Sequence, residues 1–320
     1  MRKKNLLLIL LLTLILLGIA ALFLGSVWVP PQEFLSSPII FQIRLPRIIA
    51  AVLVGTLLAT AGVILQGVLR NPLADPYILG VSSGAGVGAA LALGLKITQS
   101  FLGISAIPFS AFIFSLVAVF TVYNLSRVGG RTSPETLILA GVAVSAFAAA
   151  ILSLIIILTG QLQSIYFWLL GGLSSITWLE VFNLIPYTVI GLFIAYFYSK
   201  ELNALLFGEE MAMSLGVEVE RVRQILILAA ALMTAAAVSV SGLIGFVGLI
   251  IPHFVRLILG ANHRLLVPFS ALGGALLVLG ADIIARTVLS PQEIPIGIVM
   301  SLLGAPFFLY LLRRRRSGEK

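Results

Sequence analysis

Long apolar segments follow one another along nearly the whole chain, separated by short polar stretches. They lie at residues 6–27, 46–69, 77–95, 101–125, 135–159, 180–198, 223–242, 249–260, 266–289 and 294–312. Most approach the roughly 20 residues that an α-helix needs to cross the hydrocarbon core of a bilayer. The pattern predicts an all-α, polytopic membrane protein with about ten transmembrane helices, in which residues 1–320 form a single transmembrane domain.

Two segments depart from a plain span. The first resembles a signal peptide, but its apolar run from Leu6 to about Val27 exceeds the roughly 7–15 residues of a cleaved one, so we expect a retained span. The eighth, LIIPHFVRLILG (249–260), is too short to cross a bilayer and contains Pro252. Because irregular backbone is tolerated inside a membrane only where protein covers it, we expect a short or broken helix there.

The composition also indicates a membrane protein, and it excludes several kinds of functional site. The chain is 60% hydrophobic and 10% charged, whereas soluble domains carry roughly 25% charged residues. It has no cysteine, which excludes disulfides, thiolate metal sites and a cysteine nucleophile. Its net charge of +8 comes with basic residues that flank the apolar segments, the ordinary topology signal of membrane proteins rather than a sign of nucleic-acid binding.

Basic residues also predict the orientation. Both ends of the chain are basic, with Arg2 to Lys4 at one and Arg313 to Arg316 at the other. An even number of spans and the positive-inside rule place both termini in the cytoplasm, in a multi-pass protein of the inner (cytoplasmic) membrane. Most loop arginines then fall inside as well.

Arg44 and Arg47 are exceptions, because this topology puts them near the outer face. They flank Pro46 in the stretch FQIRLPRIIAAVLVG and, three residues apart, share one face of a beginning helix. Two interpretations stay open: the side chains reach for lipid headgroups, or they form a docking site for an acidic partner outside the membrane.

Two segments of equal length resemble each other. GVILQGVLRNPLADPYILG (62–80) and GLIGFVGLIIPHFVRLILG (242–260) share several glycine, leucine and proline positions and a final Ile-Leu-Gly. They begin in spans of opposite direction. Because inverted repeats are common in transporters, this pairing is a candidate inverted repeat.

The longest polar loop, residues 199–223, falls on the cytoplasmic side. It mixes glutamates with arginines, and Gly208 and Gly216 are expected to separate short helices within it. The loop is either a solvated amphipathic connector or a coupling element that docks on a soluble motor.

Other candidate chemistry is sparse. The glycine-rich stretch VSSGAGVGAA (81–90) lacks the Gly-Lys-Ser/Thr of a phosphate-binding loop. Asp282 precedes Arg286 by four residues, which indicates an ion pair or, less simply, a proton relay. His253 and His263 have no matched carboxylate cluster, so we expect neither a metal site nor a catalytic centre.

Several motifs together resemble a known family. They are RLPRIIAAVLVGTLLATAGVILQGVLRNPLADPYILGVSSGAGVGA, GEEMAMSLGV, GFVGLIIPHFVR, HRLLVP, GADIIAR and EIPIGIVMSLLGAPFFLYLL. In this order they resemble the permease subunits of binding-protein-dependent ABC importers for iron-siderophores, haem and cobalamin. The resemblance covers almost the whole chain.

The resemblance implies ten helices, a second permease copy, most simply a homodimer, and two ABC ATPase subunits that hold ATP and Mg. A substrate-binding protein delivers the ligand to the outer face. By analogy, Arg44, Arg47 and Arg286 dock that protein, and the pathway lies along the helices around 141–158 and 294–311. The residues expected to couple to the ATPase are Gly208, Glu209, Glu210, Leu215 and Gly216.

The expected function is that of a permease subunit that moves an iron-siderophore-type chelate across the inner membrane, without catalysis or a cofactor of its own. Within the same importer class, cobalamin, haem or an oxyanion remain alternative cargoes. An ion-coupled secondary transporter is more remote, because it needs intramembrane charges and the chain offers essentially Asp282. An intramembrane enzyme lacks a catalytic pair.

Overall fold

The computed structural model describes residues 3–25, 37–97, 99–101, 104–128 and 131–317. Its helices α1 to α13, the π-helix η2, the 3-10 helix η3 and the two-residue strands β1 to β4 have the following bounds: α1 Lys3–Phe23, η2 Ile39–Arg44, α2 Leu45–Val68, η3 Pro76–Leu79, α3 Val81–Gly94, β1 Ser100–Phe101, β2 Ile104–Ser105, α4 Ala106–Ser126, β3 Arg127–Val128, β4 Arg131–Thr132, α5 Pro134–Thr159, α6 Leu162–Leu169, α7 Trp178–Phe197, α8 Ser199–Leu205, α9 Glu209–Ser214, α10 Val219–Ser241, α11 Val247–Leu259, α12 His263–Thr287 and α13 Ile296–Ser317.

Ten of the described helices correspond to the ten predicted segments. Seven are long and apolar enough to cross a membrane: α1, α2 with η2, α4, α5, α7, α10 and α12. Three are apolar but shorter, namely α3, α11 and α13. The predicted all-α membrane fold is therefore confirmed. Residues 26–27 of the first expected segment, residues 102–103 of the fourth and Arg2 lie outside the described residues.

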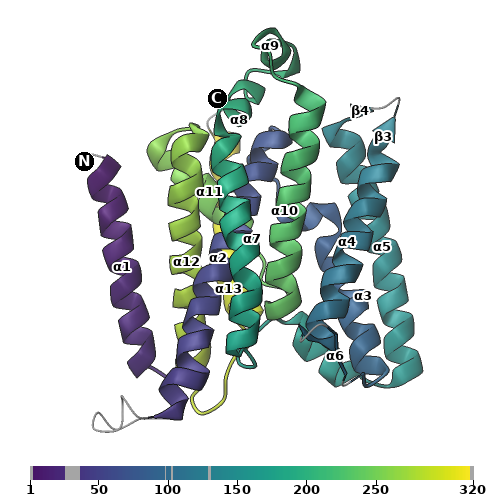
Figure 1. Cartoon of the computed structure of the whole chain (residues 1–320), viewed down its shortest axis with the longest axis vertical. Helices are drawn as coiled ribbons and strands as arrows, with labels where there is room; N and C mark the ends of the chain where they lie inside the picture. Colours follow the sequence, from purple (N-terminus) through teal and green to yellow (C-terminus); the bar gives the residue numbers. More distant parts are fainter. Residues whose placement is uncertain (1–2, 26–36, 98, 102–103, 129–130, 318–320) are drawn as a thin grey trace.

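Helix α2 forms the centre of the bundle. The most apolar 18-residue stretch of α2 with η2 is 83% buried, whereas that of α1 is only 6% buried. Helices α12, α10, α7 and α11 pack around α2, and α1 lies outside against α12 (Figure 1). Both α1 and α2 are apolar on every side, so hydropathy alone does not decide which of them is buried: an all-apolar helix is equally suited to a protein core or to lipid.

Two glycines set how closely α2 and α12 approach. A Cβ atom at Gly55 would lie 2.2 Å from the carbonyl oxygen of Gly274, and one at Gly274 would lie 2.2 Å from that of Gly55. The two backbones therefore touch at a reciprocal contact that only glycine permits, the kind of close approach that drives helix association in lipid.

The chain does not run straight between α2 and α3. After α2 it turns back at Arg70, which has a φ of 49°, and η3 then passes α2 again. A Cβ atom at Gly248 would lie 2.7 Å from Pro76 and 2.8 Å from the carbonyl oxygen of Leu58, in the middle of α2. After the exposed Arg70, residues 74–80 thus re-enter the bundle among protein, and α3 can be short because it starts inside the bundle.

The short eighth helix is observed as α11, which contains Pro252 and lies against α2 and α12. The two similar segments, 62–80 and 242–260, differ in secondary structure: the first runs from helix into loop and the second from loop into helix. They pack against each other instead, since the Gln66 amide donates hydrogen bonds to the carbonyls of Gly248 and Leu249.

The bundle has two distinct ends. Helices α8 and α9, the strand pair β3–β4, the start of α1 and the end of α13 lie at one end, and α6 lies at the other (Figure 1). Each strand pair is antiparallel and only two residues long, so it closes a tight connection between helices rather than forming a sheet. We call these the α9 end and the α6 end.

Candidate functional site

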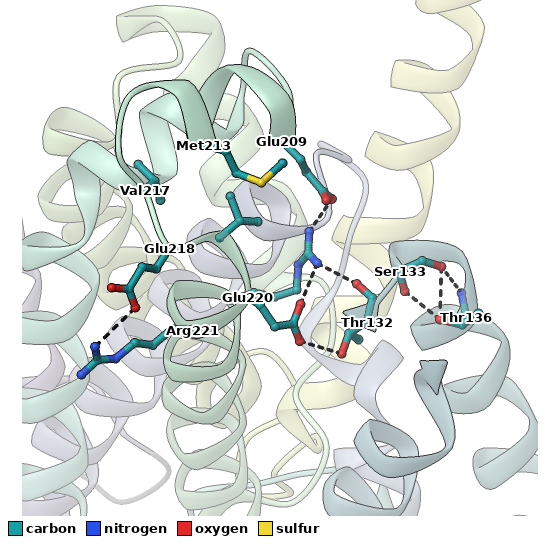
Figure 2. Close-up of a pocket in the computed structure, with 11 residues that line it drawn as sticks. Thr132, Ser133, Thr136, Glu209, Met213, Val217, Glu218, Glu220 and Arg221 are labelled. Carbon is teal, nitrogen blue, oxygen red and sulfur yellow. Dashed lines mark hydrogen bonds and ion pairs between the residues drawn. The ribbon is translucent and has the colours of Figure 1, made fainter. Parts of the chain in front are cut away.

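A cleft of about 760 Å³ opens at the α9 end, between the start of α5 and the segment from α9 to the start of α10 (Figure 2). Its lining combines carboxylates, guanidinium groups and hydroxyls with three apolar side chains. The lining residues are Thr132, Ser133, Thr136, Glu209, Met213, Val217, Glu218, Val219, Glu220, Arg221 and Arg223. The expected coupling loop therefore forms most of a polar cleft.

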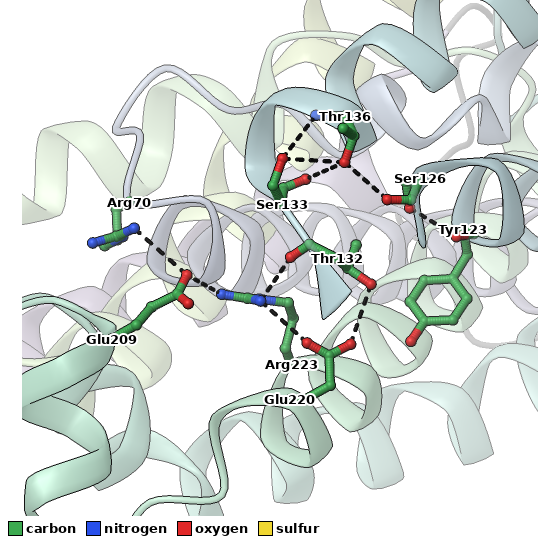
Figure 3. Close-up of polar contacts among 9 residues, drawn as sticks. All are labelled: Arg70, Tyr123, Ser126, Thr132, Ser133, Thr136, Glu209, Glu220 and Arg223. Carbon is green, nitrogen blue, oxygen red and sulfur yellow. Dashed lines mark hydrogen bonds and ion pairs between the residues drawn. The ribbon is translucent and has the colours of Figure 1, made fainter. Parts of the chain in front are cut away.

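Arg223 is the centre of this cleft's polar network (Figure 3). It is 5% exposed, and its Nη1 donates to the carbonyl oxygen of Thr132 at 2.7 Å and to Glu220 at 3.3 Å. Its Nη2 pairs with Glu209 of α9. A buried guanidinium requires such partners because an unpaired buried charge is costly. One side chain thus holds α9, α10 and β4 together.

Glu209 extends the network to a further element. The same carboxylate oxygen that binds Arg223 lies 3.6 Å from Nη2 of Arg70, in the turn after α2. Thr132 adds a hydrogen bond from its hydroxyl to Glu220 at 3.2 Å. Through Glu209, the short helix α9 is therefore linked by charge both to α10 and to the end of the central helix.

The geometry of α9 follows from the two glycines predicted to bound it. Gly208 has a φ of 108° and Gly216 a φ of 83°, a region that L side chains rarely adopt. Between them lies a helix of six residues, Glu209–Ser214, which confirms the predicted short helix. Its buried residue is Ala212, so the small helix rests on a small side chain.

An apolar tip projects from this base. Phe207 is 78% exposed and Leu215 64% exposed, and Met211 and Met213 are each about half exposed. Glu210 is exposed too. Large apolar side chains that gather at the polar end of a membrane bundle mark an interaction surface, because they lie outside the lipid and their exposure to water is unfavourable.

The side chains of the three arginines that were expected near the outer face are buried within the protein. Arg44 is 5% exposed, Arg47 6% and Arg286 2%. Arg44 donates hydrogen bonds to the carbonyls of Leu22 and Phe23, so it caps the last turn of α1, where a cation also complements the helix dipole.

Arg47 and Arg286 share one carboxylate. Asp282 is fully buried; its Oδ1 lies 2.8 Å from Nε of Arg47 and its Oδ2 lies 3.4 Å from Nε of Arg286. Arg47 also pairs with Glu293 at 2.9 Å. The i,i+4 ion pair expected for Asp282 and Arg286 is present, and a second arginine joins it from α2.

Sequence reasoning missed Arg223, Arg70 and Thr132. It placed Arg223 in the candidate coupling loop without giving it a role, and it interpreted Arg70 as a topology signal only. The i,i+3 spacing of Glu220 and Arg223 at the start of a helix was a usable local signal, but the contacts with Thr132 and Glu209 join residues far apart in the chain. Among the described residues no group of three His, Asp or Glu side chains could hold a metal ion, and His263 is buried with its ring against Asn203.

The two helices expected to line the pathway do not adjoin within one chain. Helix α5 packs on α3 and α4, whereas α13 packs on α12 and α11. The middle of α5 exposes small side chains at helical spacing, Ala143, Ala146, Ala150 and Ser153. One chain alone thus leaves a face of α5 uncovered.

Comparison with known proteins places the chain in a family. The model of the FecCD transport family matches residues 11–314. The cobalamin import system permease BtuC of Halobacterium salinarum is 46% identical over 87% of this chain and 74% of its own length. The hemin transport permease HmuU of Yersinia pestis is 40% identical over 94% and 90%.

Further comparisons agree. The iron(3+)-hydroxamate import permease FhuB of Bacillus subtilis is 40% identical over 94% of this chain and 79% of its own length. A solved metal-chelate type ABC transporter in an inward-facing conformation superposes with a TM-score of 0.86, at 35% identity and over 97% of this chain and 99% of that one. The chain is therefore a multi-span membrane permease that belongs to the FecCD transport family.

Proposed function

We propose that this chain is the permease subunit of an ATP-driven importer that moves an iron-siderophore-type chelate across the inner membrane. The observation that carries the proposal is the apolar tip of α9 on its ion-paired base, because it offers a soluble motor a surface and a firm connection to the bundle. Iron-hydroxamate, hemin and cobalamin import permeases among the relatives support this class of cargo.

The coupling step follows from the Arg223 network. An ABC ATPase that binds the apolar tip around Leu215 displaces α9 when the ATPase binds and hydrolyses ATP. Glu209 carries this displacement to Arg223 on α10 and to Arg70 beneath α2. Packed helices respond to such a push by shifting between discrete arrangements, which here are the outward-open and inward-open pathways. The chain itself performs no covalent chemistry.

We propose that two copies enclose the pathway, because α5 and α13 do not adjoin within one chain. In the homodimer the small-residue face of α5, Ala143 to Ser153, lies toward the centre. Both termini and the α9 end are cytoplasmic in this arrangement, in accord with the basic residues found there.

The α6 end then faces outward and receives a substrate-binding protein. Arg44, Arg47 and Arg286 belong to this docking region, but their side chains are paired within the chain. We propose that they act by fixing the surface above them, where Glu293 is 30% exposed, and not by projecting from it.

An ion-coupled secondary transporter is less well supported. Such a protein needs an acid that can exchange a proton or a cation at membrane depth. Both oxygens of Asp282 are already engaged by arginines. Cobalamin, haem or an oxyanion are alternative cargoes within the importer class. The reconstitution experiment below distinguishes them from a ferric chelate.

The test is to purify the chain gently from native membranes, identify what accompanies it, and reconstitute the complex with its binding protein. We expect a stoichiometric ABC ATPase, two permease copies, and ATP hydrolysis that rises when the binding protein carries a ferric hydroxamate. Stimulation by cobalamin or haem alone would replace the cargo and keep the class. A lone permease, under conditions where control ABC complexes survive, would overturn the proposal.

A further inference from the structure

An apolar groove of about 410 Å³ runs between α4 and α10 on the side of the bundle. Its walls are almost entirely aliphatic and aromatic, and one end carries a single charge, Arg127. The lining residues are Leu116, Val119, Phe120, Tyr123, Arg127, Gln224, Ile227, Leu228, Ala231 and Leu232. Since α4 and α10 both have the length and apolarity of membrane spans, a groove between them lies at membrane depth.

The groove has the length of one lipid leaflet. At a rise of about 1.5 Å per residue, α4 from Leu116 to Arg127 covers roughly 16 Å. The hydrocarbon core of a bilayer is about 30 Å thick, so one leaflet supplies about half of that length. With Arg127 at headgroup level, the other end of the groove reaches the bilayer midplane. An acyl chain fits this path from the headgroup to its terminal methyl.

The charge at the mouth favours an anion. The Arg127 guanidinium lies 5.9 Å from the centroid of the Tyr123 ring, a cation–π contact that holds it over the groove. Arg127 is exposed, and among the described residues no carboxylate lines this groove or pairs with Arg127. A lone arginine at the membrane surface attracts anionic lipid headgroups.

From this geometry we infer that the α4–α10 groove binds one anionic phospholipid, with its phosphate on Arg127 and an acyl chain along Phe120 and Leu228. The site neighbours the coupling cleft, because Arg127 is the strand partner of Thr132, whose carbonyl receives the hydrogen bond from Arg223. Figure 3 shows a second hydrogen-bonded set beside this cluster, formed by Tyr123, Ser126, Ser133 and Thr136. The backbone from Thr132 to Ser133 connects the two sets. The bound lipid therefore braces the base of α9.

The experiment measures lipid retention by the purified full-length chain. Dioleoyl-phosphatidylglycerol and dioleoyl-phosphatidylcholine compete for the chain in detergent, and intact-protein mass spectrometry counts each bound lipid. We expect a preference for phosphatidylglycerol that Arg127→Gln lowers about fivefold, the effect of roughly 1 kcal/mol expected for one arginine at an anionic surface. Leu228→Trp, which fills the groove from an exposed position, should reduce retention of both lipids.

Arg264→Gln is the matched control, since it removes an exposed arginine at the same end of the bundle but at the start of α12. An equal loss of preference in the Arg127 and Arg264 variants would mean diffuse surface charge and would overturn the site. A second outcome would also overturn the site: the Leu228→Trp chain retains lipid as before but changes its oligomeric state. That result would mean that a second copy of the chain, and not a lipid, covers the groove. None of these readouts depends on an ATPase, so the proposed importer function stands or falls separately.

Discussion

At the scale of single residues, the buried charges of this chain are explained by partners that lie far away in the sequence. Asp282 is fully buried in an apolar helix, where a lone carboxylate would be very costly. It is accommodated because Arg47 and Arg286 each take one of its oxygens. Arg47 in turn shares its charge with Glu293. The cluster joins α2 to α12 near the α6 end.

We therefore predict that Asp282→Asn destabilises the chain by about 3–5 kcal/mol, because it leaves Arg286 charged, buried and without its carboxylate. Denaturant unfolding in detergent micelles measures the change. Glu218→Gln is the control: it breaks the exposed pair with Arg221 and should have little effect.

A double substitution tests whether the loss is electrostatic. Asp282→Leu together with Arg286→Leu removes the shared carboxylate and one of its two arginines, while Arg47 keeps its ion pair with Glu293. We expect this chain to be more stable than the Asp282→Asn chain, since no buried guanidinium is then left without a carboxylate. Equal destabilisation by both would show that the loss comes from packing rather than from an uncompensated charge.

At the scale of elements, the contact between α2 and α12 depends on backbone approach. Gly55 and Gly274 touch each other's carbonyl oxygens at a separation that leaves no room for a methyl group. The Arg47–Asp282 ion pair joins the same two helices. Any movement that opens the bundle must therefore carry α2 and α12 together.

Gly274→Ala should lower the stability of the chain by about 1–3 kcal/mol, the usual cost of overpacking a tight interior. The same change at Gly280 is the internal control, because nothing lies within 4 Å of a Cβ atom there and alanine is the better helix former. The midpoints of thermal unfolding of the two variants should move in opposite directions. A Gly274→Ala chain as stable as the parent would disprove the close contact.

The second element to consider is α9, which reaches the bundle through Arg223. Arg223→Gln keeps some hydrogen bonding but removes the charge that holds Glu209 and Glu220. We expect ligand-stimulated ATP hydrolysis to fall about tenfold in the reconstituted complex, while the ATPase still co-purifies through the apolar tip. Arg221→Gln, two residues away and exposed, should leave the stimulation unchanged. Normal stimulation in the Arg223 variant would rule out the proposed coupling route.

At the scale of the whole molecule, the pathway that we propose needs a second copy of the chain. The central helix is 83% buried along its apolar stretch, and α5 packs on α3 and α4 whereas α13 packs on α12 and α11. A pathway bounded by α5 and α13 therefore needs a second copy, with the small side chains leaving space for the cargo.

The absence of native cysteine makes this arrangement testable without background labelling. Ser153→Cys on α5 should react with a membrane-impermeant maleimide in the assembled complex, because that face lines an aqueous pathway. Phe193→Cys, on the exposed apolar side of α7, should remain unmodified in lipid. Protection of both positions would place α5 against lipid or a tight interface and contradict the proposed pathway.

Much of the fold was predictable because a bilayer imposes simple rules on a sequence. Apolar segments of sufficient length become helices, since backbone groups in hydrocarbon must be paired internally. That rule predicted the ten apolar helices that the described residues contain, including the short α11. Gly208 and Gly216 predicted the ends of α9, and both have positive φ in the structure. The similarity of 62–80 and 242–260 did not predict a shared structure, because apolar composition alone makes such segments alike.

The sequence by itself determined what is local: which residues form helices, where glycine interrupts them, and which family the motifs resemble. Only the tertiary structure decided what each charge does. Arg44, Arg47 and Arg223 look alike as basic residues beside apolar runs, yet one caps α1, one neutralises a buried carboxylate and one anchors α9. The reason is physical. A helix-forming pattern is satisfied within a few residues, whereas most of the partners of these three arginines belong to distant elements that the packing brings to them.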